Sequence, residues 1–404
     1  MSGNLPISDR SLRVPPSPIR KLVPLAEQAK KRGLIVYRLN IGQPDIPTPP
    51  EFFKAVAEYP QTVLEYGRSQ GEISLLEALS NYYASKGYAI QPENIQVTTG
   101  GSEAISFALL IVAQPGDEIL VFEPFYTNYN SFAVTTGVKL VPVPTSAETG
   151  FHLPGRVEIE SRITSKTRAI LICTPNNPTG TVYQQDEMQM LGQICRERDL
   201  YLISDEAYRE LVYFGEHFGV LNLNEQSDRV ILVDSFSKRF SLCGARLGCL
   251  VSKNKDVMQA AFRLGQARLS PPTLDEYGLF HTLKLGNGYF QSICEEYKKR
   301  RDLVFSELKK IPDVVCQQPE GAFYVMAKFP IPDIENFASW LLTDFNFENQ
   351  TLMIAPGPGF YATPGKGRQE ARIAYVLGIG KLRRAMQTLK EAVKAYSAVP
   401  TGID

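Results

Sequence analysis

A single lysine, Lys238, stands where covalent chemistry is expected. It follows an apolar run at residues 230–233 that is typical of a buried strand, and two hydroxyl residues, Ser235 and Ser237, lie just before it. A lysine at the mouth of a sheet loses part of its hydration, and a desolvated amine is a good nucleophile. Because most lysines are simply solvated surface charges, the assignment depends on what else reaches that edge.

The elements that would position this lysine are apolar, β-branched runs, most of them separated by helix-like stretches. These runs cover residues 95–99, 118–122, 169–173, 201–204, 230–233 and 247–251. Such alternation predicts an α/β fold with a mostly parallel central sheet covered by helices. In sheets of this kind, ligands bind beyond the carboxyl ends of the strands.

Polar and aromatic residues follow the ends of the predicted strands, so the fold would gather them at one edge. They are Gly101, Ser102, Tyr126, Asn177, Asp205, Tyr208, Ser235, Ser237 and Lys238. The glycine turn before Ser102 opens a predicted helix, whose free N–H groups favour a phosphate, although an ordinary N-cap is the alternative. The chain has neither a G-x-x-x-x-G-K-[ST] nor a G-x-G-x-x-G motif, so a ligand with one phosphate fits best.

Asp205 is the acidic member of this group. A carboxylate at the inner edge of a sheet is costly to bury unless it meets a cation or a strong donor. The pyridinium nitrogen of an aromatic cofactor would be such a partner, and capping of the next helix is the alternative.

Length and local patterns predict two unequal domains and an arm. A chain of 404 residues exceeds what one hydrophobic core usually supports. Residues 1–20 are predicted to form an extended arm without a regular helix, because prolines interrupt them. Residues 48–285 would form the large, cofactor-binding domain, and residues 21–47 with 286–404 a small α+β domain. That small domain would contain helices at 24–32, 289–310 and 381–396 and strands at 37–41, 323–326 and 372–375.

Composition narrows the class of function. Basic and acidic residues balance at 43 each, which argues against a nucleic-acid or anionic-membrane partner. The six cysteines are scattered without ligand spacing, so we expect no disulfide framework, no metal site and a reducing, cytoplasmic location. No apolar run is long enough to span a membrane, and the N-terminal residues lack a signal-peptide pattern.

Taken in order, the motifs resemble the class I and II aminotransferases of pyridoxal-phosphate fold type I, aspartate aminotransferases among them. The resemblance spans nearly the whole chain and rests on Gly101-Ser102, Tyr126, Asn177-Pro178-Thr179-Gly180, Asp205-Glu206-Ala207-Tyr208, Ser235-Phe236-Ser237-Lys238, Arg246 and Arg372. It implies an enzyme that uses pyridoxal 5'-phosphate to move the α-amino group of an acidic, aromatic or apolar L-amino acid to a 2-oxo acid. It also implies a ping-pong mechanism and a homodimer with active sites at the interface.

The same resemblance assigns a role to each residue. Lys238 would carry the cofactor as a Schiff base and move the substrate proton, while Asp205 would keep the pyridine nitrogen protonated. Tyr208 and Asn177 would bind the phenolic oxygen of the cofactor, and the cofactor ring would stack on Tyr126. The phosphate would be bound by Gly101, Ser102, Ser235, Ser237, Arg246 and, from the partner subunit, Tyr66. The substrate α-carboxylate would be bound by Arg372 with Asn177 and the backbone N–H of Gly42.

Departures from the family pattern leave the substrate side chain open. Tyr129 stands where some aspartate aminotransferases carry a histidine, and it could donate a hydrogen bond to Asp205. Ser102 stands where thermophilic bacterial aspartate enzymes carry a lysine for the distal carboxylate. Arg268 is a substitute candidate for that contact, and a purely structural arginine is the equal alternative. An apolar or aromatic substrate would suit the aromatic residues Tyr126, Phe323, Tyr324 and Phe360.

Three rival functions remain at this stage. A β-eliminating lyase on the same fold would share every cofactor contact. A serine hydrolase would use Ser102, because residues 100–104 nearly fit the G-x-S-x-G elbow, with His281 as the downstream base. That scheme leaves Lys238, Arg246 and Arg372 without a role. A ligand sensor would need a basic DNA-binding extension, and the chain has only its short arm.

Overall fold

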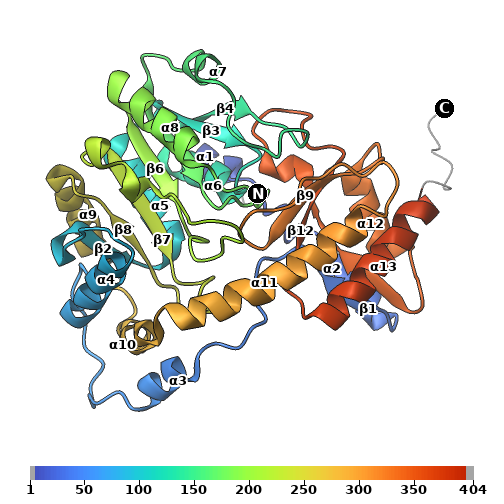
Figure 1. Cartoon of the computed structure of the whole chain (residues 1–404), viewed down its shortest axis with the longest axis horizontal. Coiled ribbons are helices and arrows are strands. Elements are labelled where there is room, and N and C mark those ends of the chain that lie inside the picture. The colour runs from blue at the N-terminus through green and yellow to red at the C-terminus, as the bar shows by residue number, and fades with distance from the viewer. Residues whose placement is uncertain (1–4, 397–404) are drawn as a thin grey trace.

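The fold is built on a seven-stranded sheet with the strand order β2-β8-β7-β6-β5-β3-β4 (Figure 1). The computed structural model of the chain describes residues 5–396. The strands of the large sheet are β2 (Ile95–Thr98), β3 (Glu118–Glu123), β4 (Lys139–Pro144), β5 (Thr167–Cys173), β6 (Tyr201–Asp205), β7 (Val230–Ser235) and β8 (Gly248–Val251). Only β8 runs antiparallel to its neighbours, so the predicted mostly parallel α/β sheet is confirmed.

One strand of this sheet, β4, was not predicted. Its sequence carries two prolines, Pro142 and Pro144, which lack the N–H that a central strand needs. The strand nevertheless forms because it lies at the edge of the sheet and pairs only with β3.

Helices cover both faces of the large sheet because successive side chains along a strand point to opposite sides. In β7, Ile231 and Val233 pack into one apolar cluster, whereas Leu232 packs into the other. The first cluster is completed by α5 (Gly100–Val112), α6 (Asn128–Thr136) and α9 (Lys255–Arg268). The second is completed by α4 (Ile73–Ser85), α8 (Gln185–Glu197) and α10 (Thr273–Thr282).

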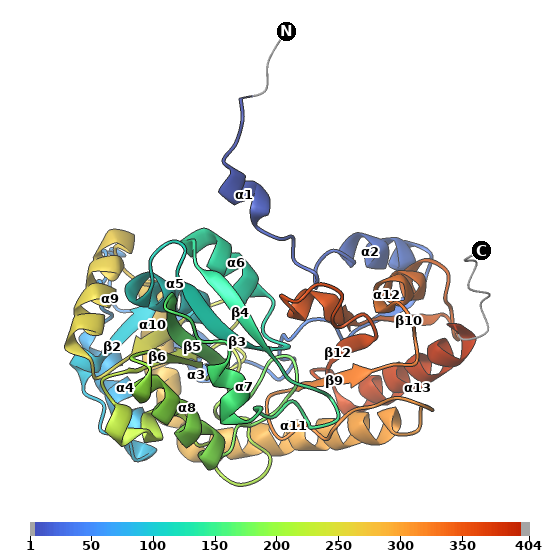
Figure 2. The same cartoon turned by 90° about the horizontal axis from the view of Figure 1, so that it is seen from above.

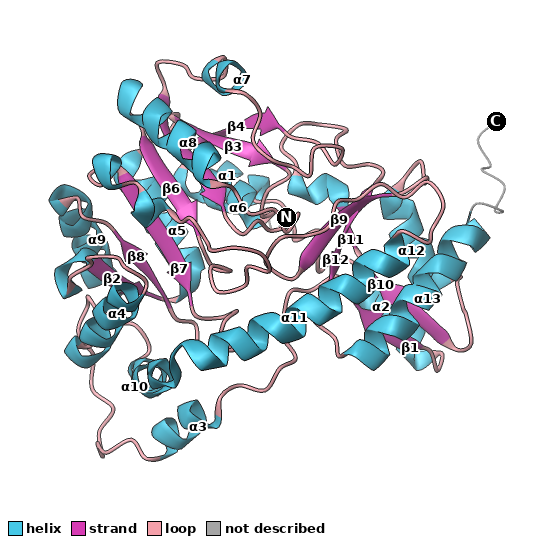
Figure 3. Ribbon diagram, viewed as in Figure 1, coloured by secondary structure: helices cyan, strands magenta, loops and turns pink. Residues whose placement is uncertain are grey.

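Two smaller sheets lie beside the large one. The parallel pair is β1 (Ile35–Arg38) with β10 (Gln350–Met353), and the antiparallel sheet has the order β11 (Ala355–Pro356), β12 (Glu370–Ala374), β9 (Tyr324–Lys328). The helices on this side are α2 (Val23–Lys31), α12 (Ile334–Thr343) and α13 (Ile379–Tyr396). Figure 3 shows the long helix α11 (Gly286–Leu308) passing from the large sheet to the smaller ones, where it packs against α13. The division into domains at residues 47 and 285 stays a prediction.

Most predicted elements are present with ends shifted by a few residues. Strand β1 covers residues 35–38 instead of 37–41, so it overlaps its predicted range only at residues 37 and 38. The remaining short elements are α3 (Pro50–Ala57), α7 (Arg156–Glu160), η1 (Pro92–Asn94), η2 (Val220–Asn222), η3 (Asn224–Gln226), η4 (Leu283–Leu285) and η5 (Gly357–Phe360). Between residues 5 and 396, no helix has both the length and the apolar character needed to cross a membrane.

The N-terminal arm differs from the prediction in one respect. It contains a short helix, α1 (Asp9–Arg13), whose N-cap Ser8 accepts a hydrogen bond from the Ser11 N–H. The expectation that prolines exclude a helix is therefore wrong here, since residues 9–13 lie between prolines and carry a good N-cap. Figure 2 shows α1 on the upper side of the molecule, where it contacts α6, and the chain then continues to α2.

Candidate active site

A cavity of about 550 Å³ opens at the carboxyl ends of β5, β6 and β7, where the smaller sheets meet the large one. Every predicted site residue except Tyr66 lines it. These residues are Gly42, Gly101, Ser102, Tyr126, Asn177, Asp205, Tyr208, Ser235, Ser237, Lys238, Arg246 and Arg372. The residues expected at the strand ends thus lie together, and Gly42, Arg246 and Arg372 reach the same cavity from other segments.

Lys238 lies in the loop that follows β7, with its amine at the cavity. Its Nζ donates a hydrogen bond to the Gly42 carbonyl at 2.8 Å. The backbone beside it is firmly held, because the next residue, Arg239, is buried in an ion pair with Asp234 and donates to the Tyr82 hydroxyl at 2.7 Å. The amine is thus half-buried on a rigid support.

Asp205 is the last residue of β6, and its carboxylate is nearly buried at 7% exposure. Its partners are neutral: the Tyr129 hydroxyl donates at 2.9 Å, as the sequence suggested it could, and the Ala207 N–H donates at 3.2 Å. Among residues 5–396, no cationic side chain forms an ion pair with it. Burial consequently raises the pKa of Asp205 to about 6. A cationic N–H donor in the cavity would find an unmatched negative charge here.

The start of α5 and the Arg246 side chain lie together in an arrangement suited to bind an anion. Gly100 has a φ of +75°, and a Cβ at this position would lie 2.5 Å from Nη2 of Arg246. The glycine therefore allows the guanidinium to lie directly against a helix N-terminus, where two sources of positive potential add. Hydroxyls of Ser102, Ser235 and Ser237 line the same region. Arg246 itself has a φ of +55°, a conformation that costs free energy and is held by its surroundings.

A buried arginine lies opposite, on β12 of the small antiparallel sheet. Arg372 is 1% exposed, and it donates to Asn177 Oδ1 at 2.8 Å and to the Asn40 carbonyl at 2.6 Å. The rings of Tyr324 and Phe360 lie 4.4 and 5.0 Å from its guanidinium carbon. Its Nε has no hydrogen-bond partner among the described residues. A fixed guanidinium of this kind is suited to bind a carboxylate.

Gly42 and two tyrosines form a close contact that the sequence did not predict. A Cβ on Gly42 would lie only 1.7 Å from the Tyr324 hydroxyl, so no other residue fits without displacing that ring. The Tyr324 hydroxyl in turn lies 2.9 Å from the Tyr208 hydroxyl. Tyr324 thereby joins the loop at residue 42 to the large sheet. Of the four aromatic residues considered for substrate contact, Tyr126 and Tyr324 line the cavity, whereas Phe323 and Phe360 are buried behind it.

Two predicted residues lie outside this cavity. Tyr66 is 84% exposed on the loop between α3 and α4. Arg268 pairs with Glu103 at 2.8 Å and donates to the Ser69 and Val97 carbonyls, so its guanidinium holds backbone together. In this subunit the contacts of Arg268 are those of a purely structural arginine. They do not support the contact with a distal carboxylate for which Arg268 was considered.

Several lining residues were missed. They are Ser17, Ile19, Arg20, Ile41, Gln43, Ile105, Asn128, Cys173, Ala207 and Cys243. The arm residues carried no motif, and only the return of the arm towards α2 brings them to the cavity. None of the three histidines lines it, so Ser102 lacks the base that a hydrolase would need.

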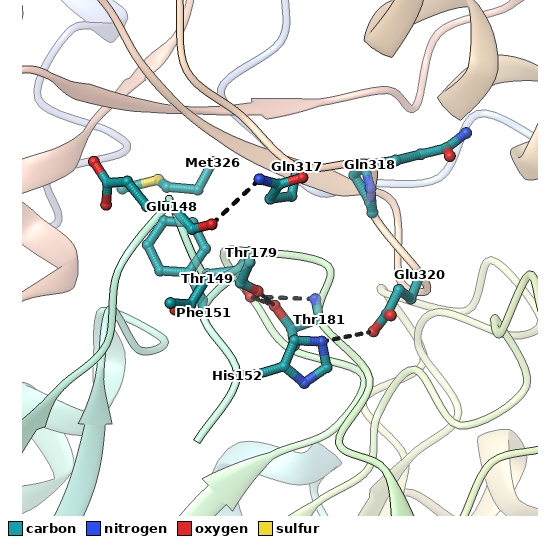
Figure 4. Close-up of a pocket in the computed structure, with 12 residues that line it drawn as sticks. Glu148, Thr149, Phe151, His152, Thr179, Thr181, Gln317, Gln318, Glu320 and Met326 are labelled. Carbon is teal, nitrogen blue, oxygen red and sulfur yellow. Dashed lines mark hydrogen bonds and ion pairs between the residues drawn. The ribbon is translucent and has the colours of Figure 1, made fainter. Parts of the chain in front are cut away.

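A second cavity of about 420 Å³ is lined by Thr179 and Thr181, which follow Asn177 along the chain (Figure 4). His152 stands at its wall between two carboxylates, 2.9 Å from Glu187 and 3.5 Å from Glu320. These neighbours raise the pKa of His152 to about 10, so the ring is cationic at neutral pH. Glu320 also accepts from the Val182 N–H at 3.0 Å, and its own N–H donates to Gly180. The cluster therefore supports the turn that follows Asn177.

Comparison with known proteins gives a consistent result. The profile of the family described as "Aminotransferase class I and II" matches residues 35–368. An aspartate aminotransferase of Thermotoga maritima is 31% identical over 386 residues, which cover 94% of this chain and 98% of that protein. Aromatic-amino-acid aminotransferase 2 of Thermococcus litoralis is 31% identical over 406 residues, covering 97% of this chain and 100% of that protein.

Solved structures agree with the sequence comparisons. The structure of an alanine aminotransferase from Pyrococcus furiosus superimposes with a TM-score of 0.88 at 30% identity, covering 96% of this chain and all of that one. The three proteins are named for an acidic substrate, for aromatic substrates and for a small apolar one.

Proposed function

This chain belongs to the class I and II aminotransferases, and from that premise we propose how its residues perform the reaction. The enzyme is a pyridoxal-phosphate-dependent transferase of amino groups, and its substrates are amino acids and oxo acids. We propose that an L-amino acid donates its α-amino group and a 2-oxo acid accepts it, one after the other in ping-pong order, at the cavity around Lys238.

The residues of the cavity fit the cofactor. Gly100 lets the Arg246 guanidinium lie against the start of α5, where a phosphate would be bound, and Asp205 supplies an unmatched buried carboxylate for a protonated ring nitrogen. When bound, pyridoxal phosphate supplies an aromatic ring that accepts the electron pair of the substrate's broken Cα–H bond. The phosphate would be held by Gly101, Ser102, Ser235, Ser237 and Arg246. The phenolic oxygen would be bound by Asn177 and Tyr208, and the ring would stack on Tyr126.

Lys238 is the residue to which we assign covalent attachment and proton transfer. Its half-buried amine is available to the cofactor carbonyl and, once released, can take a proton from the substrate α-carbon. The substrate α-carboxylate would be bound by Arg372, whose orientation Asn177 fixes, with the Gly42 N–H as a second donor. Because Arg372 is already held by its neighbours, little entropy is lost when the substrate binds.

The observation that supports this proposal best is the convergence of three chemically different ionisable groups, two basic and one acidic, on one cavity. A half-buried amine, a buried carboxylate with neutral partners and a buried guanidinium arrive from β7, β6 and β12. Lys238→Ala should abolish both the visible absorbance of bound cofactor and transamination. Lys253→Ala, which changes an amine two residues beyond β8, is the matched control. If Lys238→Ala retained both properties, the assignment would be wrong.

A half-reaction screen tests the reaction type and the substrate class together. Single amino acids from the acidic, aromatic and apolar classes are added to the loaded enzyme without an oxo acid. Transamination should give one equivalent of 2-oxo acid per site and no ammonia. Continued release of ammonia with oxo acid would instead identify a β-eliminating lyase.

We also propose a homodimer in which Tyr66 reaches the phosphate in the partner subunit. The proposal is supported by exposed apolar side chains in the same segment, Phe53, Val63, Leu64 and Ile73, which are typical of an interface. Mixed dimers provide the test. A dimer of one Lys238→Ala and one Tyr66→Phe subunit has one intact site if Tyr66 acts across the interface, and none if it acts within its own subunit. A cytoplasmic location stays a prediction.

A further inference from the structure

One basic residue of the cavity has no role in the reaction described above. In the part of the chain that the structure describes, four basic side chains line the cavity: Arg20, Lys238, Arg246 and Arg372. The last three serve the cofactor and the α-carboxylate under the proposed function. Arg20 makes no side-chain hydrogen bond and no ion pair with any residue between 5 and 396. It comes from the arm, which the sequence analysis treated as a simple extension.

The backbone beside Arg20 is held in place, although its side chain is free. The Ile19 carbonyl accepts a hydrogen bond from Asn40 Nδ2 at 3.0 Å, and the Ile19 side chain packs against the buried cluster around Phe360. Pro18 lies so close to Gly359 that a Cβ there would be 2.3 Å from the proline ring. On the other side, Lys21 forms an ion pair with Glu335. The arm therefore presents Arg20 from a fixed position.

Asn40 connects this position to the α-carboxylate site. Its side chain donates to Ile19, and its carbonyl accepts from Arg372 at 2.6 Å. Arg20 and Arg372 are thus carried by segments bonded to the same residue, so the spacing between their attachment points is set by the fold. Two guanidinium groups held in this way can recognise two anionic groups of one small molecule.

The charges in the cavity leave Arg20 without a partner. Asp205 is the only carboxylate that lines it among residues 5–396, and under the proposed function it faces the cofactor ring. The phosphate belongs to Arg246 and the α-carboxylate to Arg372. A further anion, supplied by the substrate, would complete the balance.

We propose that Arg20 binds the distal carboxylate of a dicarboxylic amino or oxo acid, and so makes such compounds preferred substrates. The proposal rests on the proposed function, since it assumes that Arg372 takes the α-carboxylate. It assigns to the arm the contact for which Arg268 was considered. Because the guanidinium is exposed when the cavity is empty, its hydration is exchanged for a charge-assisted hydrogen bond on binding.

Ligand binding to the cofactor-loaded enzyme tests the proposal without turnover. The probes are succinate, which carries two carboxylates, and propionate, which carries one; calorimetry gives both dissociation constants. The wild type should bind succinate more tightly, and Arg20→Gln should weaken succinate binding by about tenfold to a hundredfold while propionate binding stays the same. Arg13→Gln changes an exposed arginine of the same arm that does not line the cavity, so it is the matched control and should retain the preference. Arg20→Lys should retain part of it.

Steady-state kinetics gives the second readout. For Arg20→Gln, kcat/KM should fall for L-aspartate and L-glutamate and stay unchanged for L-alanine. A wild type without a preference for succinate, or an Arg20→Gln enzyme that keeps it, overturns the proposal. If no amino acid is transaminated at all, the proposed function fails, whereas the succinate titration still decides the role of Arg20.

Discussion

Asp205→Asn should stabilise the cofactor-free protein while it weakens cofactor binding. Burial raises the pKa of this carboxyl from its ordinary value of 3.8 to about 6. Because the folded-state pKa lies above the unfolded value, the protonated carboxyl favours the fold below pH 3.8, and this stability is lost as the pH rises through about 6. The difference between the two pKa values corresponds to a loss of about 3 kcal/mol in the free energy of unfolding. Asparagine is neutral throughout, and it keeps an oxygen for the Ala207 N–H and an amide facing Tyr129.

Urea unfolding of the two cofactor-free proteins between pH 4 and pH 8 measures this effect. The variant should gain stability over the wild type steadily from about pH 4 to about pH 6, and the gain should then level off at about 3 kcal/mol. The same variant should bind pyridoxal phosphate more weakly, because the ring nitrogen loses its ionic partner. A stability difference that does not change with pH would refute the reasoning, since it would mean that Asp205 is not destabilised by its burial.

Three further changes test other contacts of the site. Arg372→Lys should lower kcat/KM about tenfold or more for every amino acid, because an ammonium cannot bind a carboxylate in bidentate fashion; equal values for both enzymes would contradict that role. Gly42→Ala should displace the Tyr324 ring and raise KM for the amino acid substrate. Gly155→Ala, whose added Cβ meets no atom within 4 Å, should leave KM unchanged. An unchanged KM in Gly42→Ala would show that the contact with Tyr324 is unimportant. In the wild type, the ion pairs of His152 should stabilise the fold at neutral pH, and this stability should be lost as the pH rises through about 10. His152→Gln should remove this contribution, so the free energies of unfolding of the two proteins should differ more at pH 7 than at pH 10. An equal difference at both pH values would exclude the ion pairs.

The parts of the site that the sequence predicted are those that depend on local order along the chain. Asp205 and Ser235 end apolar strands and Lys238 follows one, and a parallel sheet places such strand ends at one edge whatever connects them. The mostly parallel sheet was also predicted from local order, because apolar runs alternate with helix-like stretches along the chain. Strand β4 was missed because its prolines weaken the local pattern, although an edge position tolerates them.

The parts that the sequence did not predict depend on contacts between distant segments. Arg20 reaches the cavity only because Asn40 and Gly359 hold the arm against the small sheets. Arg268 stands in a suitable place along the chain, but carbonyls of Ser69 and Val97 and the Glu103 carboxylate take up its guanidinium. No local pattern distinguishes a free arginine from an engaged one.

The reversed strand β8 has a consequence for how the chemistry is encoded. A connection between two parallel strands starts at the carboxyl edge of the sheet and must return to the opposite edge. Only its first residues therefore lie near the cavity. Because β8 returns antiparallel to β7, with Ser235 opposite Gly248, the whole loop between them stays at the catalytic edge. Lys238 and Arg246 both lie on that loop, so a single short stretch of the gene specifies the attachment point and the anion clamp together. Insertions or deletions in the other loops can therefore alter which side chains are accepted while this pair keeps its spacing.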